Sequence, residues 1–282
     1  MSQGVIYIAV GGQHVGEAVT SAASLKKCMP DLPITLFSSE PVASPYFNQV
    51  KVIDGPRYGT PGLDKISNMY DSPYEYTLFL DSDTYICADL LEIFNLLDKF
   101  DMAVAHAPLR IAPTHINGRE WIPYQFTEIP ESFPEMNTGV ILYKKNYKVE
   151  LFFQKWLNLC KQKVKKQGKP YHDQATFRSV LYESDLITAT LTPEYNCRFI
   201  FPVFVSSKVK ILHGRHPNFE VIASKINSET GMRVFTPQDF HQPQPERVDE
   251  PKNHKNQRVF KIREELEKSK IRLKQIQEQM KS

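Results

Sequence analysis

The sequence has few cysteines, few glycines and no long hydrophobic run. Four cysteines and 12 glycines occur in 282 residues, and no C-x-x-C spacing is present, which excludes a disulfide scaffold and argues against a zinc site. The longest early apolar run, Val5 to Val10, follows no basic segment and ends at Gly11-Gly12, so we expect neither a signal peptide nor a membrane span. These absences predict a cytoplasmic protein with reduced, buried cysteines.

Neither sign of charge dominates the whole sequence. Lys and Arg number 35 and Asp and Glu 32, a formal net charge of +3, so no overall electrostatic field favours a nucleic-acid partner. Hydrophobic residues make up 41% and charged residues 24% of the chain, which is the composition of a folded globular protein. The length suits one large domain or two small ones.

The composition changes near the carboxyl end. Between about Pro237 and His254 the sequence is rich in Pro, Gln and charge, which is typical of a linker. We therefore predict a domain over residues 1–240, a linker over 241–254 and a helix over 255–282. The apolar residues of the last segment recur at alternating spacings of three and four, interrupted by Ser269; they are Val259, Ile262, Leu266, Leu273, Ile276 and Met280.

The 255–282 segment is basic as well as amphipathic. It contains nine Lys or Arg and four Glu, so the basic character of the chain resides there. Its narrow apolar stripe suits a short coiled coil that would form a homodimer. Its charge, together with that stripe, suits the surface of an anionic membrane. The sequence leaves both partners open, and the second would make the protein peripheral at a membrane.

Short apolar runs alternate with helical patterns through the predicted domain. Gly4 to Val10 is β-branched and apolar, and apolar residues then fall at helical spacing from Val15 to Leu25. This alternation indicates an α/β fold, whose ligands bind outside the carboxyl ends of the strands. We expect further strands at 33–37, 50–53, 76–80, 102–105, 137–143, 187–191 and 209–212, and further helices at 63–70, 89–97, 147–165 and 173–182.

A proline-rich segment interrupts the alternation. Residues 107–135 contain five prolines and show no sustained period. A loop of that length inside a compact domain is more often a lid or a binding loop than a simple connection. We therefore expect this segment to cover or line a binding site.

Two carboxylates leave one of the predicted strands together. Tyr76 to Leu80 reads YTLFL and is followed at once by Asp81-Ser82-Asp83, which places both aspartates where an α/β sheet binds its ligand. Carboxylates suit Mg²⁺ or Mn²⁺, which proteins commonly hold with one or two such groups and the phosphates of a substrate. A solvated turn would use the same residue types, but the apolar strand before them favours a metal site.

Further motifs follow in an order that a known family shares. The ordered set is Lys65 in LDKISNMY, then Asp81-Ser82-Asp83, MNTGVILYKKN at 136–146, HDQATF at 172–177 and ILHGRH at 211–216. The sequence resembles the nucleotide-sugar glycosyltransferases of the GT-A fold, most closely family 8, the glycogenin and lipooligosaccharide galactosyltransferase type. The resemblance spans about residues 4–216. It implies a Rossmann-like nucleotide-diphospho-sugar transferase domain, here with a helical tail at its carboxyl end.

The resemblance also implies a role for each motif. Asp81, Asp83 and His213 would hold Mn²⁺, or Mg²⁺, against the diphosphate of a nucleoside diphosphate sugar, with a UDP-sugar expected as donor. The sugar itself would be contacted by Asp173, Gln174 and Asn137. Further contacts with the nucleotide and its phosphates are expected from Ala9, Gly11, Lys65, Ser82, Gly214 and Arg215. The acceptor would be a hydroxyl of a carbohydrate, of a lipid-linked molecule or of a protein.

Three other functions use parts of the same pattern. A haloacid-dehalogenase-like phosphatase employs the first Asp of D-x-D as a nucleophile, but it wants Thr or Val where Tyr85 stands. A sugar-nucleotide pyrophosphorylase needs a basic residue in its Gly-rich loop, and the 11–14 segment GGQH has no Lys or Arg. A non-catalytic adaptor that acts through the basic tail would leave the ordered motifs unexplained. The sequence therefore favours glycosyl transfer.

Overall fold

The computed structural model describes residues 1–55, 61–111, 115–116, 119–120, 126, 128–167 and 173–236. The predicted linker and tail, 241–254 and 255–282, lie outside these residues. The strands are β1 (Gln3–Ala9), β2 (Ile34–Ser38), β3 (Gln49–Val52), β4 (Tyr76–Leu80), β5 (Thr84–Ile86), β6 (Met102–His106), β7 (His115–Ile116), β8 (Arg119–Glu120), β9 (Met136–Lys144), β10 (Thr188–Leu191), β11 (Val203–Val205), β12 (Ile211–His213) and β13 (Arg233–Phe235). The helices are α1 (Gly12–Cys28), α2 (Pro61–Asn68), α3 (Tyr147–Gln167), α4 (Asp173–Tyr182) and α5 (Phe219–Ile226), with 3₁₀ turns η1 (Met69–Asp71), η2 (Leu91–Asp98) and η3 (Pro193–Tyr195).

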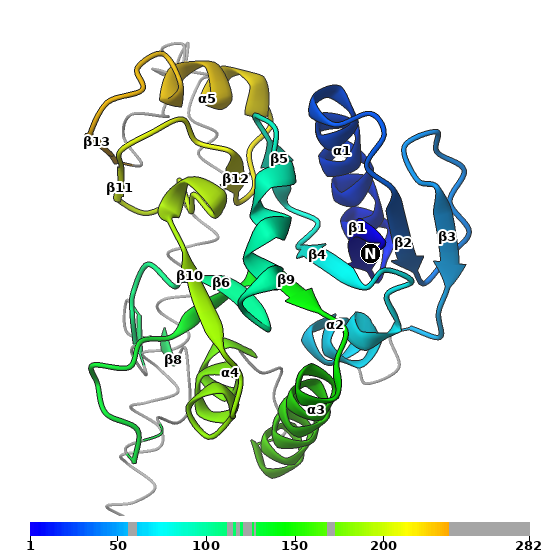
Figure 1. Ribbon diagram of the computed structural model, residues 1–282, viewed down its shortest axis with the longest axis vertical. Coiled ribbons are helices and arrows are strands. Elements are labelled where there is room, and N and C mark those ends of the chain that lie inside the picture. Colours follow the sequence, from blue (N-terminus) through cyan, green and yellow to red (C-terminus); the bar gives the residue numbers. More distant parts are fainter. Residues whose placement is uncertain are drawn as a thin grey trace, which may run out of the picture. The chain divides into compact units, whose positions relative to one another are not determined.

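A seven-stranded sheet with the order β10-β6-β9-β4-β1-β2-β3 forms the centre of residues 1–236 (Figure 1). Every strand runs in the same direction except β9, which is antiparallel to both β4 and β6. The carboxyl ends of β1, β4, β6 and β10 therefore meet at one edge of the sheet. A ligand that binds at that edge can reach side chains that follow several strands.

Two hydrophobic cores cover the two faces of the sheet. On β1, Val5 and Tyr7 point into the core that includes the apolar side of α1, while Ile6 points into the core under α2, α3 and α4. Figure 1 shows α1 on one side of the sheet and α2, α3 and α4 gathered on the other. This alternation is the period of two that a strand imposes on its side chains. It explains why strands buried on both faces consist of nearly continuous apolar residues.

A smaller sheet brings the chain after η3 back to the strand ends. Strand β12 pairs antiparallel with β5, so that His213 lies opposite Thr84. A third hydrophobic cluster, which includes Leu212 and Ile222, packs α5 against this ribbon. The pairing holds the end of β12 beside the residues that follow β4.

Most of the expected elements are present with shifted ends. The strand at 76–80 and the helix at 173–182 have the predicted bounds, and the predicted helix at 89–97 is instead the 3₁₀ turn η2. The predictions missed α5 and the short strands β5, β11 and β13. Within the predicted loop 107–135 the structure has a short hairpin formed by β7 and β8. Several other residues of that loop lie outside the described residues.

The four cysteines are free, as the sequence predicts, but they are not all buried. Cys160 and Cys197 are buried, whereas Cys28 and Cys87 are half-buried. None of the helices in the described residues is long and apolar enough to cross a lipid bilayer.

Candidate metal centre and adjoining cavities

Asp81, Asp83 and His213 come together at the carboxyl end of β4. Oxygen atoms of Asp81 and Asp83 lie 3.7 and 3.4 Å from Nε2 of His213, and one ligand atom from each residue lies within 4.8 Å of the others. The local fold explains this convergence, because β12 pairs with β5 directly after Asp83. The backbone N–H of Gly214 also donates to the carbonyl oxygen of Asp83 at 2.9 Å.

Gly139 of β9 provides the space beneath these three side chains. Its carbonyl oxygen accepts a hydrogen bond of 2.7 Å from the backbone N–H of Asp81. A Cβ atom at position 139 would lie 2.1 Å from Cε1 of His213 and 2.7 Å from Oδ2 of Asp81. Real Cβ atoms do not approach other atoms this closely, so only glycine lets the aspartate and the imidazole share this place.

A chain of amide groups fixes the tautomer of His213. The backbone N–H of Gly139 donates to Oδ1 of Asn137 at 3.2 Å, and Nδ2 of Asn196 donates to the same oxygen at 2.9 Å. Oδ1 of Asn196 is then left to accept from Nδ1 of His213, at 2.8 Å. Because a backbone N–H can only donate, each orientation follows from the one before it. The proton therefore sits on Nδ1, and the lone pair of a neutral imidazole lies on Nε2, which faces the two aspartates.

The electrostatics of this cluster fit a divalent cation. Burial lowers the pKa of His213, and the Arg198 guanidinium lowers it further, so the ring is neutral near pH 7. Burial alone would raise the pKa of Asp83, but this pKa lies below its usual range, and the Arg215 and Arg198 guanidinium groups contribute to lowering it. Burial raises the pKa of Asp81 despite Lys65 nearby. Two carboxylates and an imidazole lone pair that face one another form a donor set suited to Mn²⁺, which accepts both oxygen and nitrogen ligands.

Lys65 lies in a cavity next to the aspartates. The cavity has a volume of about 230 Å³ and is lined by Ile8 and Val10 at the end of β1, by Lys65 and by Asp173; we call it the Lys65 cavity. Nζ of Lys65 lies 2.7 Å from Oδ2 of Asp173 and 3.4 Å from Oδ1 of Asp81. Burial would lower the pKa of Lys65, but the two carboxylates outweigh it and hold the pKa above its usual range. The ammonium group is therefore a fixed positive charge.

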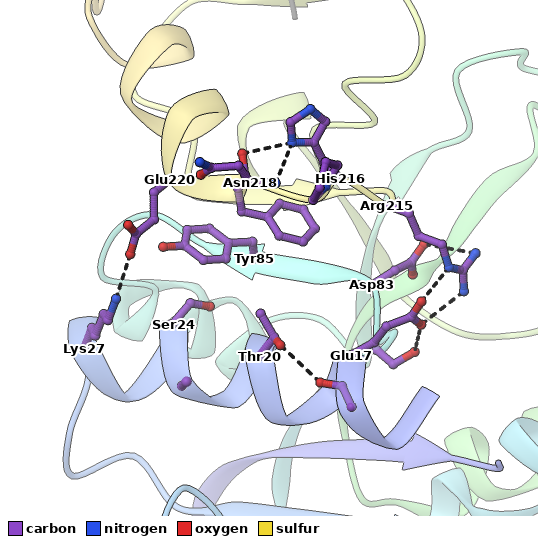
Figure 2. Close-up of a pocket in the computed structure, with 15 residues that line it drawn as sticks. Glu17, Thr20, Ser24, Lys27, Asp83, Tyr85, Arg215, His216, Asn218 and Glu220 are labelled. Carbon is purple, nitrogen blue, oxygen red and sulfur yellow. Dashed lines mark hydrogen bonds and ion pairs between the residues drawn. The ribbon is translucent and has the colours of Figure 1, made fainter. Parts of the chain in front are cut away.

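Arg215 separates the Lys65 cavity from a larger one. It donates from Nε and Nη2 to Glu17 at 2.6 and 3.1 Å, and its Nη1 lies 3.9 Å from Oδ2 of Asp83. The larger cavity, of about 690 Å³, lies along α1, and Figure 2 shows Glu17 and Arg215 at one end and the ion pair of Lys27 with Glu220 at the other. Arg215 and Asp83 line both cavities.

Comparison with solved structures identifies the fold, although no family model and no curated protein matches the sequence. The apo-form glycosyltransferase GlyE of Streptococcus pneumoniae TIGR4 matches 77% of this chain with a TM-score of 0.52 and 16% identity. The galactosyltransferase LgtC, solved with donor and acceptor sugar analogues, matches 79% of this chain and 92% of its own, with a TM-score of 0.50 and 11% identity. The chain has the GT-A fold. It spans about half of GlyE, of which 55% is matched.

Within this GT-A fold the predicted site residues do not all lie at the cavities. Ser82 donates to Glu17 at 3.1 Å and lines the Lys65 cavity. Gln174 follows Asp173 at the start of α4 and is half-buried. Ala9 is buried in the core beneath α1. Gly11 has a φ of 89° and donates its N–H to Ser39 at 3.0 Å, so it shapes the turn before α1.

Two important residues were missed at the sequence level. Asn196 orients His213, and Arg198 adds positive charge behind it. Both follow η3, in the segment YNCRF at 195–199, which has no helical or strand period. The one available signal was a polar residue on each side of the buried Cys197, and that pattern is too common to assign a role.

Proposed function

We propose that this protein is a metal-dependent glycosyltransferase that moves a sugar from a nucleoside diphosphate sugar, a UDP-sugar, to the hydroxyl of an acceptor. The observation that carries the proposal is the cluster of Asp81, Asp83 and His213, in which an imidazole lone pair faces two carboxylates beside the Lys65 cavity. The GT-A fold supports it, because the two solved structures compared above, GlyE and LgtC, are of glycosyltransferases.

Asp81, Asp83 and His213 would hold Mn²⁺. The bound ion would supply positive charge where the departing diphosphate becomes more negative. The ammonium group of Lys65 lines the cavity named after it and would add a second fixed positive charge at the phosphates. Arg215 would add a third, because its guanidinium reaches the same cavity beside Asp83.

Asp173 and Gln174 would contact the transferred sugar. The Asp173 carboxylate accepts from Lys65 at 2.7 Å and from the Thr138 hydroxyl at 3.0 Å, so its position is fixed at the wall of the cavity. A fixed carboxylate favours the oxocarbenium character that develops as the bond to the sugar breaks. Asn137 has its oxygen occupied by Gly139 and Asn196, so any contact of Asn137 with the sugar would come from Nδ2.

A thermal-shift screen tests the proposal. UDP-, GDP-, CMP- and dTDP-sugars are each added with and without Mn²⁺, and we expect the UDP-sugar to raise Tm only when Mn²⁺ is present. Asp81→Ala and Asp83→Ala should remove that shift and leave the fold intact. Asp31→Ala, an exposed aspartate beyond the end of α1, is the matched control and should keep it. An unchanged Mn²⁺-dependent shift in both Asp81→Ala and Asp83→Ala would contradict the proposed metal site.

The proposal extends to the organisation of the chain. Residues 1–240 would form the catalytic domain and residues 241–254 a linker. Residues 255–282 would form a basic amphipathic helix that lies on an anionic membrane surface. Such attachment would bring the enzyme to lipid-linked acceptors.

A further inference from the structure

A third cavity opens at the same edge of the sheet as the metal centre. It has a volume of about 400 Å³, and residues at the carboxyl ends of β6 and β10 line it together with Arg198; we call it the Arg198 cavity. Because β4, β6 and β10 run in the same direction, this cavity and the Lys65 cavity share one edge. Strand β9 lies between β6 and β4 in the sheet, and its Gly139 lies beneath the aspartates and His213. The metal centre thus stands between the two cavities.

The described lining of the Arg198 cavity carries positive charge and no carboxylate. The guanidinium groups of Arg110 and Arg198 supply this charge, and neither Asp nor Glu is among the described lining residues. Nε of Arg198 is buried and has no hydrogen-bond partner. Within the described part of the chain, no carboxylate forms an ion pair with the guanidinium of Arg198 or Arg110. A buried donor without a hydrogen-bond partner is costly, so Nε of Arg198 favours an acceptor atom in the cavity, such as the oxygen of an anion.

The backbone at Arg110 supports the same conclusion. Its φ is 63°, the only positive φ of a non-glycine residue within the described ranges, and such values are uncommon for residues other than Gly, Asn and Asp. Its N–H donates to the carbonyl oxygen of Ala107 at 3.0 Å, and its own carbonyl oxygen accepts from the N–H of Glu135. The surrounding structure therefore holds Arg110 in an unfavourable conformation at the cavity, which is a feature of binding sites.

Arg198 and Asn196 connect this cavity to the metal centre. Asn196 lines the cavity and holds the imidazole of His213. The guanidinium of Arg198 also interacts electrostatically with the carboxylates of Asp83 and Asp81. A molecule in the Arg198 cavity would thus lie within reach of a reaction at the metal centre.

We propose that the Arg198 cavity binds the acceptor, and that this acceptor is a sugar that carries an anionic group, a phosphate or a carboxylate. The inference rests on the proposed function, because a transferase needs a second substrate beside the donor. With the donor in the Lys65 cavity, the Arg198 cavity offers a place on the opposite side of the same centre. Arg110 and Arg198 bind the anionic group, since guanidinium groups match the oxygens of phosphate and carboxylate.

Four probes separate the anion from the sugar ring. Glucose, glucose 6-phosphate and glucuronate share one ring and differ in charge at the sixth carbon, and inorganic phosphate carries the charge without the ring. Binding is measured by calorimetry and by ligand-observed NMR, with neither Mn²⁺ nor a nucleotide sugar present, so that the result does not depend on transfer. We expect glucose 6-phosphate or glucuronate to bind more tightly than glucose. Which of the two binds more tightly distinguishes a phosphorylated acceptor from a uronic acid.

Matched variants test whether the anionic sugar binds in the Arg198 cavity. Arg110→Gln and Arg198→Gln should each weaken binding of the anionic sugar by about tenfold or more, which is the size expected for a lost charged hydrogen bond. Lys208→Gln, an exposed cation outside the cavity lining, should leave it unchanged. Arg110 is exposed, so its variant remains a test even if Arg198→Gln fails to fold.

Three results would overturn the inference: glucose that binds as tightly as the anionic sugars, no binding of either anionic sugar, or binding that Arg110→Gln does not weaken. The inference would also be wrong if Arg198→Gln weakened Mn²⁺-dependent binding of the UDP-sugar but not of the anionic sugar, because Arg198 would then serve the donor. Failure of the proposed function is distinct from all of these. It would appear as the absence of Mn²⁺-dependent nucleotide-sugar binding in the unaltered protein.

Discussion

Nδ1 of His213 lies 2.8 Å from the amide oxygen of Asn196, and this contact decides which ring nitrogen faces the aspartates. Neutral groups alone fix this arrangement: the N–H of Gly139, the amide of Asn137 and the amide of Asn196, which we call the amide relay. The amide oxygen accepts the Nδ1 proton without adding a negative charge that would raise the pKa of the imidazole. The amide relay thus fixes the tautomer of the ring, while burial and Arg198 keep the ring neutral.

Asn196→Ala should weaken Mn²⁺ binding by about tenfold to a hundredfold, which is the usual cost of losing a group that orients a metal-binding histidine. The His213 ring would lose the acceptor that fixes its tautomer. Calorimetry of Mn²⁺ binding measures the affinity, and ¹⁵N NMR of the imidazole reports the tautomer directly. A variant whose Nδ1 remained protonated and whose Mn²⁺ affinity was unchanged would remove Asn196 from this role.

The matched control for Asn196 is Asn227→Ala. Asn227 also uses both ends of its amide, accepting from the N–H of Val209 at 2.8 Å and donating to its carbonyl oxygen at 3.0 Å. It has no contact with the metal centre in the described residues. Its loss should lower the free energy of unfolding by about 1 kcal/mol per hydrogen bond and leave Mn²⁺ affinity as it was.

Gly139→Ala should abolish Mn²⁺ binding while most of the sheet stays folded. The new methyl group would occupy the place of the His213 ring and of the Asp81 carboxylate, so both side chains would have to leave their positions. Gly231→Ala is the control, because a Cβ there meets nothing within 4 Å. Circular dichroism checks the fold and calorimetry the metal. Normal Mn²⁺ affinity in Gly139→Ala would show that the metal binds elsewhere.

Lys65→Met should destabilise the protein by about 3 kcal/mol, the usual cost of removing one partner from a buried ion pair. Asp173 and Asp81 would be left near each other with less compensating charge. The double variant Lys65→Met, Asp173→Asn should recover part of the loss, because it removes a carboxylate as well. Urea denaturation gives the free energies of unfolding. If the double variant were no more stable than Lys65→Met, the pair would not be coupled.

Asp173→Asn by itself separates binding from turnover. The amide keeps the size of the side chain but removes the negative charge proposed to lie near the transferred sugar. We expect the transfer rate to fall far more than the affinity for the nucleotide sugar. A wild-type rate would reassign Asp173 to the start of α4, where a carboxylate interacts favourably with the helix dipole.

Deletion of residues 243–282 should abolish binding to anionic vesicles and leave the molecular mass in solution at that of the shortened chain. The removed segment carries the basic amphipathic pattern, and each basic residue near an anionic surface contributes about 1 kcal/mol. Vesicle co-sedimentation and analytical ultracentrifugation measure the two properties. A dimer that becomes a monomer on deletion would indicate the coiled coil instead.

Local patterns predicted those parts of the fold that depend on short segments. The run from Tyr76 to Leu80 is apolar and ends at two aspartates, so both the strand and its acidic exit could be predicted. The antiparallel pair of β5 and β12 could not, because three residues are too few to show a period. The Leu-rich η2 has helical spacing, and its 3₁₀ geometry depends on packing in the tertiary structure. Asn196 was missed because its role exists only through contacts with Asn137 and His213, far away in the sequence.

The amide relay begins at a main-chain group, the N–H of Gly139. Every side-chain replacement at neighbouring positions leaves this donor in place, so an alanine scan would trace the relay back only to Asn137. An ester in place of the peptide bond between residues 138 and 139 would remove the donor and keep the path of β9. The tautomer of His213, at the end of β12, thus depends on a backbone N–H group of β9. Side-chain mutation leaves that group unaltered.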